Sequence, residues 1–378
     1  MPPIQTSPGR LAVDHVQSLS PYVPGKPIEE LQRELGLTDI IKLASNENPF
    51  GPSPVALEAM RAAVADSWLY PDGSGHVLKA ALAGRLGVQP AQITLGNGSN
   101  DVLVLLAEAF LKPGLEAIYS QYAFAVYPIA VQATGATAVV SAALPAGSPM
   151  ELGHDLSAMA RAITPATRLI FIANPNNPTG TWVPAAELEA FVASVPDHAL
   201  VVLDEAYFEY TVDAAGASLG LEDGIAWLAR YPNLVVVRTF SKAYGLAGVR
   251  VGYAVSHPAV ADMLNRVRQA FNVSVVGLAG AAAALGDMAH VDRAVRVAAA
   301  ERTRVAARLR GLGTPVLPSA GNFLLLKAGS DAPRRFNQLL HAGIIVRPVA
   351  NYGLPEHLRV TLGTPEQNDR FLRAWEAC

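Results

Sequence analysis

Two cations stand in an otherwise apolar, glycine-spaced stretch of the sequence. The segment TFSKAYGLAGVRVGY (239–253) follows the β-like run 234–237 and carries Lys242 and, eight residues later, Arg250. A lysine buried among apolar groups loses its proton readily, and the neutral amine can form a Schiff base. The planar guanidinium of an arginine can clamp a phosphate. Taken alone, however, Lys242 fits better a lysine that reaches solvent, and only the pattern of residues below reverses that judgement.

Two further stretches place polar side chains directly after apolar runs. In ALVVLDEAYFEY, Asp204 ends the run 199–203 and Tyr207 follows, whereas ANPNNPTG holds Asn177 in a rigid, proline-containing turn after RLIFI. Ligands of open α/β sheets bind outside the carboxyl ends of the strands, and a carboxylate there needs a positive partner. Taken singly, Asp204 fits a turn cap, Tyr207 a packing residue and Asn177 plain turn chemistry.

The segment LGNGSND (95–101) predicts an anion site. It precedes the apolar helical stretch DVLVLLAEAF, so Ser99 and Asn100 would lie at a helix N-terminus, where free N–H groups and the dipole favour anions. Ser99 alone is most simply an N-cap, and neither a GxGxxG nor a Walker A pattern is present. A Schiff-base lysine, a phosphate-binding arginine, a helix N-terminus and an aspartate for a pyridinium nitrogen together describe a pyridoxal phosphate site.

The elements that must position these residues follow an α/β pattern. Apolar runs without clean alternation recur at 116–120, 137–143, 167–173, 198–204 and 233–239, with helical stretches between several of them. Such runs fit strands buried on both faces of a mostly parallel sheet that helices cover. After about residue 256 the pattern becomes α+β. We therefore expect an N-terminal arm with part of the small domain (1–50), a large cofactor-binding domain (51–275) and a C-terminal small domain (276–378).

Composition excludes several classes of function. The 378 residues carry a formal net charge of −3, which argues against a nucleic-acid-binding footprint. The single cysteine, Cys378, allows no intrachain disulfide and fits a reducing compartment. The sequence has no run of about 18 apolar residues and no apolar leader, so we expect no membrane span, no metal site of thiolates and a cytoplasmic protein.

Eight strings in the order of one family span about residues 20 to 370. They are LASNENPFGPS, YPDGSG, GNGS, NPNNPTG, LDEAYFEY, TFSKAYGLAGVRVGY, GIIVRPV and LRVTLGTPEQN. The sequence resembles the fold-type I, pyridoxal phosphate-dependent aminotransferases of class I/II, and most of all their histidinol-phosphate aminotransferase branch. The resemblance implies a large domain with a mostly parallel seven-stranded sheet between helices, plus a smaller α+β domain.

The resemblance also implies a role for each matching residue of the catalytic centre. Lys242 would bond the cofactor aldehyde and, once displaced by the substrate, move the proton between the substrate Cα and the cofactor C4′. Asp204 would hold the proton of the pyridinium nitrogen. Tyr207 and Asn177 would bond the phenolic oxygen and so lower the proton affinity of the lysine-linked nitrogen.

A second group of matching residues would hold the rest of the cofactor. Its phosphate would be bound by Ser99, Asn100, Ser241 and Arg250. Tyr70, in YPDGSG, is similar to a tyrosine that reaches the phosphate in the neighbouring subunit, which implies a homodimer. Phe124 matches a ring-stacking position that is often tyrosine, so stacking should survive while any hydroxyl contact is lost. The family often has an acidic residue at the position of Asn100, a second departure.

Three matching residues point to the substrate. Arg359 resembles an arginine that binds a substrate carboxylate, Arg347 resembles a second, phosphate-binding arginine, and Tyr22 resembles a tyrosine of the N-terminal arm that reaches the substrate. For Arg347 and Tyr22, ordinary surface or arm packing is the alternative. Bidentate guanidinium geometry suits both carboxylate and phosphate.

The resemblance implies ping-pong transfer of an amino group from L-histidinol phosphate to 2-oxoglutarate, giving imidazole-acetol phosphate and L-glutamate. Three alternatives stay open at this point. One is an aromatic amino-acid:2-oxoglutarate aminotransferase, and another is a pyridoxal phosphate-dependent decarboxylase of a phosphorylated amino acid. The third is a binding or regulatory protein that keeps the scaffold without catalysis, against which the intact set Lys242, Asp204 and Arg250 argues.

Overall fold

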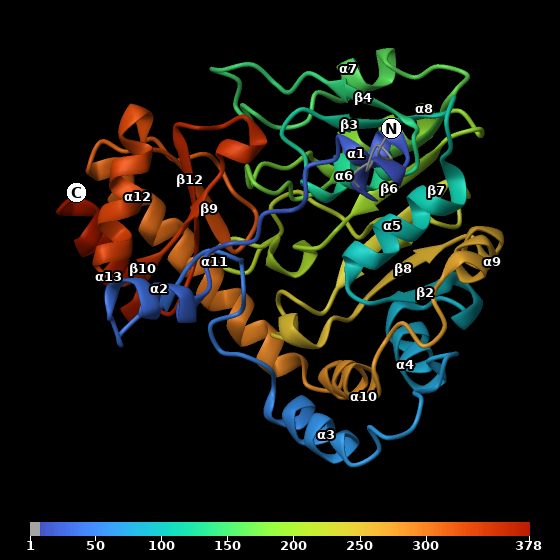
Figure 1. The fold of residues 1–378 in the computed structure, drawn as a ribbon, viewed down its shortest axis with the longest axis horizontal. Coiled ribbons are helices and arrows are strands. Elements are labelled where there is room, and N and C mark those ends of the chain that lie inside the picture. Colours follow the sequence, from blue (N-terminus) through green and yellow to red (C-terminus); the bar gives the residue numbers. More distant parts are fainter. Residues whose placement is uncertain (1–7) are drawn as a thin grey trace, which may run out of the picture.

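A seven-stranded sheet forms the centre of the larger part of the molecule (Figure 1). The computed structural model describes residues 8–378. In spatial order the strands are β2 (Ile93–Gly96), β8 (Gly252–Ser256), β7 (Leu234–Thr239), β6 (Leu200–Asp204), β5 (Thr167–Ala173), β3 (Glu116–Ser120) and β4 (Thr137–Ser141). Only β8 pairs antiparallel with its neighbours. The predicted mostly parallel seven-stranded sheet is confirmed.

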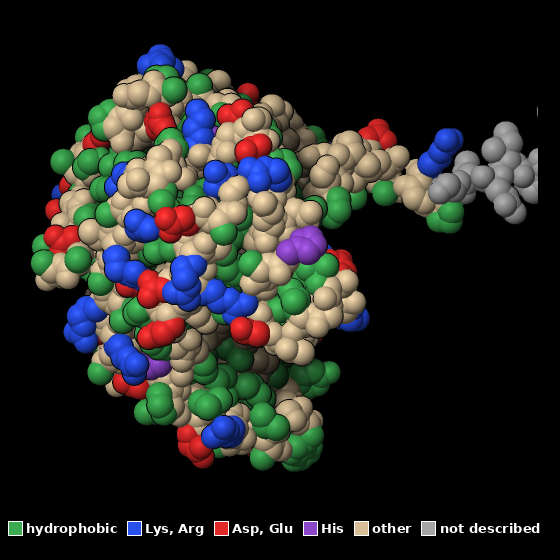
Figure 2. Space-filling view, turned by 90° about the vertical axis from the view of Figure 1, so that its left-hand side faces the viewer, with side chains coloured by type: hydrophobic (Ala, Val, Ile, Leu, Met, Phe, Trp, Pro, Cys, Tyr) green, Lys and Arg blue, Asp and Glu red, His purple; other side chains and the backbone are tan. Residues whose placement is uncertain are grey.

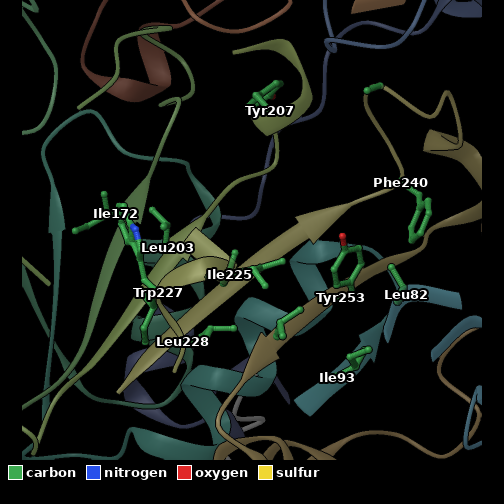
Figure 3. Close-up of a cluster of buried hydrophobic side chains, with 14 of the residues drawn as sticks. Leu82, Ile93, Ile172, Leu203, Tyr207, Ile225, Trp227, Leu228, Phe240 and Tyr253 are labelled. Carbon is green, nitrogen blue, oxygen red and sulfur yellow. The ribbon is translucent and has the colours of Figure 1, made fainter. Parts of the chain in front are cut away.

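Helices bury both faces of this sheet, as its uninterrupted apolar strands require. In β5, Leu169 and Phe171 join one hydrophobic cluster while Ile170 and Ile172 join the other. The helices α5 (Ser99–Phe110), α6 (Val126–Ala133) and α9 (Pro258–Val267) supply the first cluster. The second receives side chains from α3 (Pro54–Val64), α4 (His76–Leu86), α7 (Leu156–Arg161), α8 (Ala185–Ser194) and α10 (Val275–Ala284), and Figure 3 shows part of it around Trp227 and Leu203.

The C-terminal third builds a separate, smaller sheet. Strands β9 (Phe323–Lys327), β12 (His357–Thr361) and β11 (Arg347–Pro348) pair antiparallel, and the helices α12 (Ala332–His341) and α13 (Pro365–Glu376) belong to the same region (Figure 1). The long helix α11 (Met288–Gly311) leads to it. It contributes to the core of the larger part at Val291 and to that of the smaller part at Val305.

The N-terminal segment returns to this smaller part. Strand β1 (Ile41–Lys42) pairs in parallel with β10 (Ile344–Ile345), and Leu31 of α2 (Ile28–Leu35) packs in a cluster with Ile345. The short helix α1 (Asp14–Gln17) instead lies near α6, where Gln132 donates to the carbonyl of His15 over 3.1 Å. Helix α10, which follows the predicted boundary at 275, packs on α3 and α4 of the larger part. The division at residues 50 and 275 stays a prediction.

A buried ion pair ties together the two strand ends that lead into the candidate site. Arg238 of β7 donates to Glu205, the residue after β6, with its Nε 2.9 Å from Oε2, and to Asp223 over 2.6 Å. Its guanidinium also lies 4.1 Å from the ring centre of Phe208. Breaking a buried pair leaves an uncompensated charge, so this contact fixes the positions of the ends of β6 and β7 relative to each other.

None of the helices described over residues 8–378 is both long enough and apolar enough to cross a membrane. The cytoplasmic location stays a prediction.

Candidate active site

One pocket collects the residues singled out in the sequence. It lies at the carboxyl ends of β5, β6 and β7 and is closed on the other side by the N-terminal segment and the small sheet. Its lining includes Tyr22, Ser99, Asn100, Phe124, Asn177, Asp204, Tyr207, Ser241, Lys242, Arg250, Arg347 and Arg359. Tyr70 is the one predicted site residue that does not line it. Strand ends of an α/β sheet and a second, smaller part thus converge on a single cleft.

Lys242 lies in the turn after β7, partly exposed to the pocket. Its Nζ donates to the carbonyl oxygen of Ser45 over 2.9 Å and lies 5.7 Å from the ring centre of Tyr207. Among residues 8–378 it forms no salt bridge. Desolvation by burial, followed by the positive charge of Arg359, lowers the pKa of Lys242 to about 7. Near neutral pH a large share of these amines is therefore unprotonated and nucleophilic.

Asp204 is the last residue of β6, and each of its carboxylate oxygens accepts a hydrogen bond. The hydroxyl of Tyr127 donates to Oδ2 over 2.8 Å, and the backbone N–H of Ala206 donates to Oδ1 over 3.2 Å. Burial raises the pKa of Asp204 to about 6, and the hydrogen bond from Tyr127 is the largest effect that lowers it. Two donors thus hold this buried carboxylate in its charged form, which is the form that pairs with a pyridinium nitrogen.

Sequence reasoning missed Tyr127, although it belongs to the string YAFAVY that carries Phe124. Tyr127 is buried in α6, stacks on Phe171 with ring centres 4.8 Å apart, and meets Phe124 edge to face at 5.9 Å. It therefore contacts both the carboxylate and the ring that is predicted to stack on the cofactor. Tyr127 is three residues from Phe124, and this spacing could have indicated that both side chains lie on the same side of the helix. A single tyrosine in an apolar helix, however, is usually interpreted as a core residue.

Two arginines lie side by side on neighbouring strands of the small sheet. Arg347 of β11 and Arg359 of β12 are direct partners in an antiparallel register, both are buried, and neither forms a salt bridge among residues 8–378. Arg359 donates to Oδ1 of Asn177 and, over 2.6 Å, to the carbonyl of Ala44, while its Nε has no partner. Like charges directly opposite each other are destabilising, so this arrangement favours a bound anion.

Arg347 and Tyr22 lie together, the arginine buried and the tyrosine exposed. The guanidinium of Arg347 donates to the carbonyl of Val23 over 2.5 Å and lies 6.0 Å from the ring centre of Tyr22. Tyr22 itself is half exposed at the mouth of the pocket. This position leaves both side chains able to reach a ligand that enters from solvent.

The predicted phosphate-binding residues surround the N-terminus of α5. Gly98, with a φ of 84°, is the N-cap, so the expectation that Ser99 caps the helix is wrong: Ser99 is the first helical residue. The guanidinium of Arg250 packs where a Cβ of Gly98 would stand, and its Nη1 lies 3.3 Å from Oγ of Ser241. Free helix N–H groups, a hydroxyl and a cation suit a phosphate.

Tyr70 lies apart from this pocket. It is 83% exposed and stacks on Phe271 with ring centres 4.7 Å apart. Within its own chain it therefore makes no contribution to the pocket.

The fold and the side chains of this pocket define an α/β enzyme that binds an anionic aldehyde through a lysine. The chain belongs to the family described as aminotransferase class I and II, whose model matches residues 38–374. It is 56% identical over 366 residues to histidinol-phosphate aminotransferase 2 of Pseudomonas fluorescens, covering 96% of each chain, and 54% identical over 364 residues to the protein of that name in Methylococcus capsulatus, covering 96% and 97%.

Among solved structures, the histidinol-phosphate aminotransferase of Sinorhizobium meliloti in complex with pyridoxal-5'-phosphate matches with a TM-score of 0.83 and 32% identity, covering 97% of this chain and 96% of that one. The predicted family is thus confirmed. Pyridoxal phosphate is the cofactor that the residues fit. A lysine without a salt bridge among residues 8–378, a hydrogen-bonded carboxylate and a helix N-terminus beside an arginine match its aldehyde, ring nitrogen and phosphate.

The lowered pKa of Lys242 predicts selective chemistry of the apoprotein. Labelling by an amine-directed reagent, followed by peptide mass spectrometry between about pH 6 and pH 10, should reach half its maximum near pH 7 at Lys242, since only the neutral amine reacts. Lys26 serves as the control, because Glu30 and Glu34 raise its pKa and delay labelling to higher pH. Equal pH profiles for the two lysines would contradict this prediction.

Replacing Tyr127 tests its hold on Asp204. Tyr127→Phe removes the donor that most lowers the carboxyl pKa, so Asp204 becomes protonated at higher pH. A hydrogen bond to a charged group contributes about 1.5–3 kcal/mol, so we expect the dissociation constant of pyridoxal phosphate to rise roughly tenfold at pH 7. Titration of the apoprotein, followed by visible absorbance, measures it.

The matched control is Tyr119→Phe, whose ring packs 6.4 Å from that of Tyr127. No hydrogen bond joins its hydroxyl to Asp204 among the described side chains. If both variants bound the cofactor equally, the role of the Tyr127 hydroxyl would be refuted.

Proposed function

We propose that the chain transfers the amino group of L-histidinol phosphate to 2-oxoglutarate, giving imidazole-acetol phosphate and L-glutamate, as a step of histidine biosynthesis. The observation that carries this proposal is the pair of buried arginines, Arg347 and Arg359, which are in register on adjacent strands and meet no carboxylate within the described part of the chain. The names of the similar proteins from Pseudomonas fluorescens and Methylococcus capsulatus support the same substrate.

The two half-reactions need one site for two kinds of anion. Glutamate and 2-oxoglutarate bring carboxylates, whereas histidinol phosphate has no carboxylate and brings a phosphate. A guanidinium binds both through the same planar fork of N–H donors. Two arginines in one pocket therefore hold either substrate while the amino or keto carbon faces Lys242.

Lys242 and the residues around it would transfer the proton and hold the cofactor. Pyridoxal phosphate, when bound, supplies the electron sink that makes the substrate Cα proton acidic. The neutral amine of Lys242 is placed to take up and return that proton, and the charged Asp204 keeps the ring nitrogen protonated. Asn177 follows β5 and Tyr207 follows the neighbouring strand β6, so both would provide polar groups for the phenolic oxygen. Arg250, Ser241, Ser99 and Asn100 would orient the group by its phosphate.

A comparison of substrates tests the proposal. With 2-oxoglutarate as acceptor, kcat/KM for histidinol phosphate should exceed that for phenylalanine and for tyrosine, because those two amino acids lack the phosphate that Arg347 is proposed to bind. In Arg347→Met, kcat/KM for histidinol phosphate should fall about 10–100-fold, the loss of one or two charge-assisted hydrogen bonds. Steady-state assays of glutamate formation provide the measurement.

Unphosphorylated histidinol is the control substrate, since Arg347→Met should barely change its already low kcat/KM. An equal loss for both substrates would mean that Arg347 supports the pocket as a whole and not the phosphate. A wild-type preference for phenylalanine would make the chain an aromatic amino-acid aminotransferase. Release of carbon dioxide without amino transfer would make it a decarboxylase.

We further propose that the chain works as a homodimer in which Tyr70 reaches the cofactor phosphate of the partner subunit. Three neighbouring residues, Trp68, Leu69 and Tyr70, are exposed although apolar or aromatic, and Val64 at the end of α3 is exposed too. Figure 2 shows hydrophobic side chains gathered at the lower end of the molecule, where α3 lies. Exposed apolar patches mark interaction surfaces, and a Tyr70 outside its own pocket fits a role in another.

Mixed dimers test this arrangement. Co-expressed Lys242→Ala and Tyr70→Phe chains form a hybrid in which the intact Lys242 receives the wild-type Tyr70 only if that residue crosses the interface. Each parent homodimer should be impaired, whereas the hybrid, separated by two affinity tags, should regain about half of the wild-type activity per dimer. A hybrid no more active than Tyr70→Phe would show that Tyr70 acts within its own chain.

A further inference from the structure

The string LASNENPFGPS (43–53) received no role from the sequence, yet its residues cross the pocket. The carbonyl of Ala44 accepts from Arg359 and that of Ser45 accepts from Lys242. The amide of Asn48 donates to the carbonyl of Ala243 over 2.9 Å. This segment of the N-terminal region therefore touches the catalytic lysine and its surroundings at several points.

Asn46 is the centre of this segment. It is 1% exposed and has a φ of 57°, a left-handed conformation that asparagine tolerates better than most residues. Its backbone N–H donates to Oγ1 of Thr361 over 2.9 Å, and its carbonyl accepts from the amide of Asn322 over 3.1 Å. Its side chain lies between Thr361 and Tyr207, with Oδ1 3.1 Å from the Thr361 hydroxyl and Nδ2 2.8 Å from the Tyr207 hydroxyl.

The donors and acceptors of this cluster fix the orientation of the Asn46 amide. The hydroxyl oxygen of Thr361 accepts from the backbone N–H of Asn46, and among the described residues Oδ1 of Asn46 is the one acceptor that its proton meets. The opposite orientation of the amide would make this oxygen accept twice and leave its proton without an acceptor. Oδ1 is therefore the acceptor side, and the NH₂ group points to Tyr207. An NH₂ group can only donate, so the Tyr207 oxygen must accept, and the tyrosine's own proton is left for another partner.

We propose that Asn46 is a positioning residue, which donates to the Tyr207 hydroxyl and thereby directs the proton of Tyr207 to an acceptor in the pocket. Pyridoxal phosphate offers a phenolic oxygen as such an acceptor. A proton donated there stabilises the negative charge of that oxygen and lowers the proton affinity of the lysine-linked nitrogen. The inference rests on the cofactor of the proposed function and is independent of which substrate is used.

The groups that face this pair are charged or titratable themselves. Around Tyr207 lie Arg359, Tyr352 and Asp204, and around Lys242 lie Arg359, Glu47, Arg250 and Lys42. A substitution of the neutral Asn46 changes none of these charges. A shift of the titration in such a variant therefore reports the lost hydrogen bond and not an altered net charge.

The test is the pH titration of the visible absorbance band of the lysine-bound cofactor, recorded without substrate. Asn46→Gly removes the amide, while glycine keeps the left-handed backbone. We expect the midpoint to rise by about half a pH unit or more, and to rise further in Tyr207→Phe. The double variant Asn46→Gly/Tyr207→Phe should titrate like Tyr207→Phe alone, because Asn46 acts through that hydroxyl.

An unchanged midpoint in Asn46→Gly, or a shift that adds to that of Tyr207→Phe, would overturn the inference. Absence of the visible band from the wild type would instead overturn the cofactor assignment, and this inference with it. Midpoints that shift as expected in the variants, with histidinol phosphate failing as a substrate of the wild type, would overturn the substrate and support the role of Asn46.

A second, matched pair of variants leaves Asn46 itself unchanged. Thr361→Val removes the hydroxyl that orients the amide, whereas Thr361→Ser keeps it. The midpoint should rise in the valine variant and stay at the wild-type value in the serine variant, with the thermal midpoint of each apoprotein recorded alongside. Equal midpoints in the two variants would contradict the proposed chain from Thr361 through Asn46 to Tyr207.

Discussion

Three guanidinium groups and one lysine face one pocket, and the rest of the architecture can be understood as the means of holding them there. Lys242, Arg250, Arg347 and Arg359 form no salt bridge within residues 8–378, and carbonyl oxygens of Ser45, Ala247, Val23 and Ala44 accept their N–H groups instead. A carbonyl carries only partial charge, so the pocket keeps a positive field. Its natural complement is a ligand with a phosphate or carboxylate, which both the cofactor and the proposed substrates are.

Holding these cations requires two structural parts. In the large sheet, Lys242 and Asp204 lie at the ends of β7 and β6. The buried ion pair of Arg238 and Glu205 joins these two strand ends. The small sheet delivers the two arginines from β11 and β12, too far along the chain to come from the same strands. The segment 44–48 lies between the parts and contacts both. This segment accepts hydrogen bonds from Arg359 and Lys242 and donates one to Tyr207, so it joins the substrate-binding arginine to the residues around the cofactor.

Much of this site could be predicted because chemistry and local pattern coincide. Asp204 ends an apolar run, and Asn177 and Lys242 stand in the turns that follow such runs, so their place near the strand ends followed from sequence order. The roles of Asn46 and Tyr127 were not predicted, because their hydrogen-bond partners are remote in the sequence. Asn46 and Thr361 are 315 residues apart in the sequence, and Tyr127 and Asp204 are 77 residues apart. The N-cap at Gly98 was missed because Arg250, which fills the place of a Cβ at Gly98, is remote in the sequence. The pairing of Arg347 with Arg359 depends on strand register, which an apolar pattern alone does not specify.

The central claim is that the cationic pocket holds pyridoxal phosphate on Lys242. Reduction of the holoprotein with borohydride, followed by proteolysis and mass spectrometry, tests it most directly, because reduction makes the bond between lysine and cofactor permanent. We expect one modified peptide, carrying the pyridoxyl phosphate mass on Lys242, and its disappearance when Lys242 is replaced by alanine. Modification of another lysine in the wild type, or no modified peptide at all, would contradict the account.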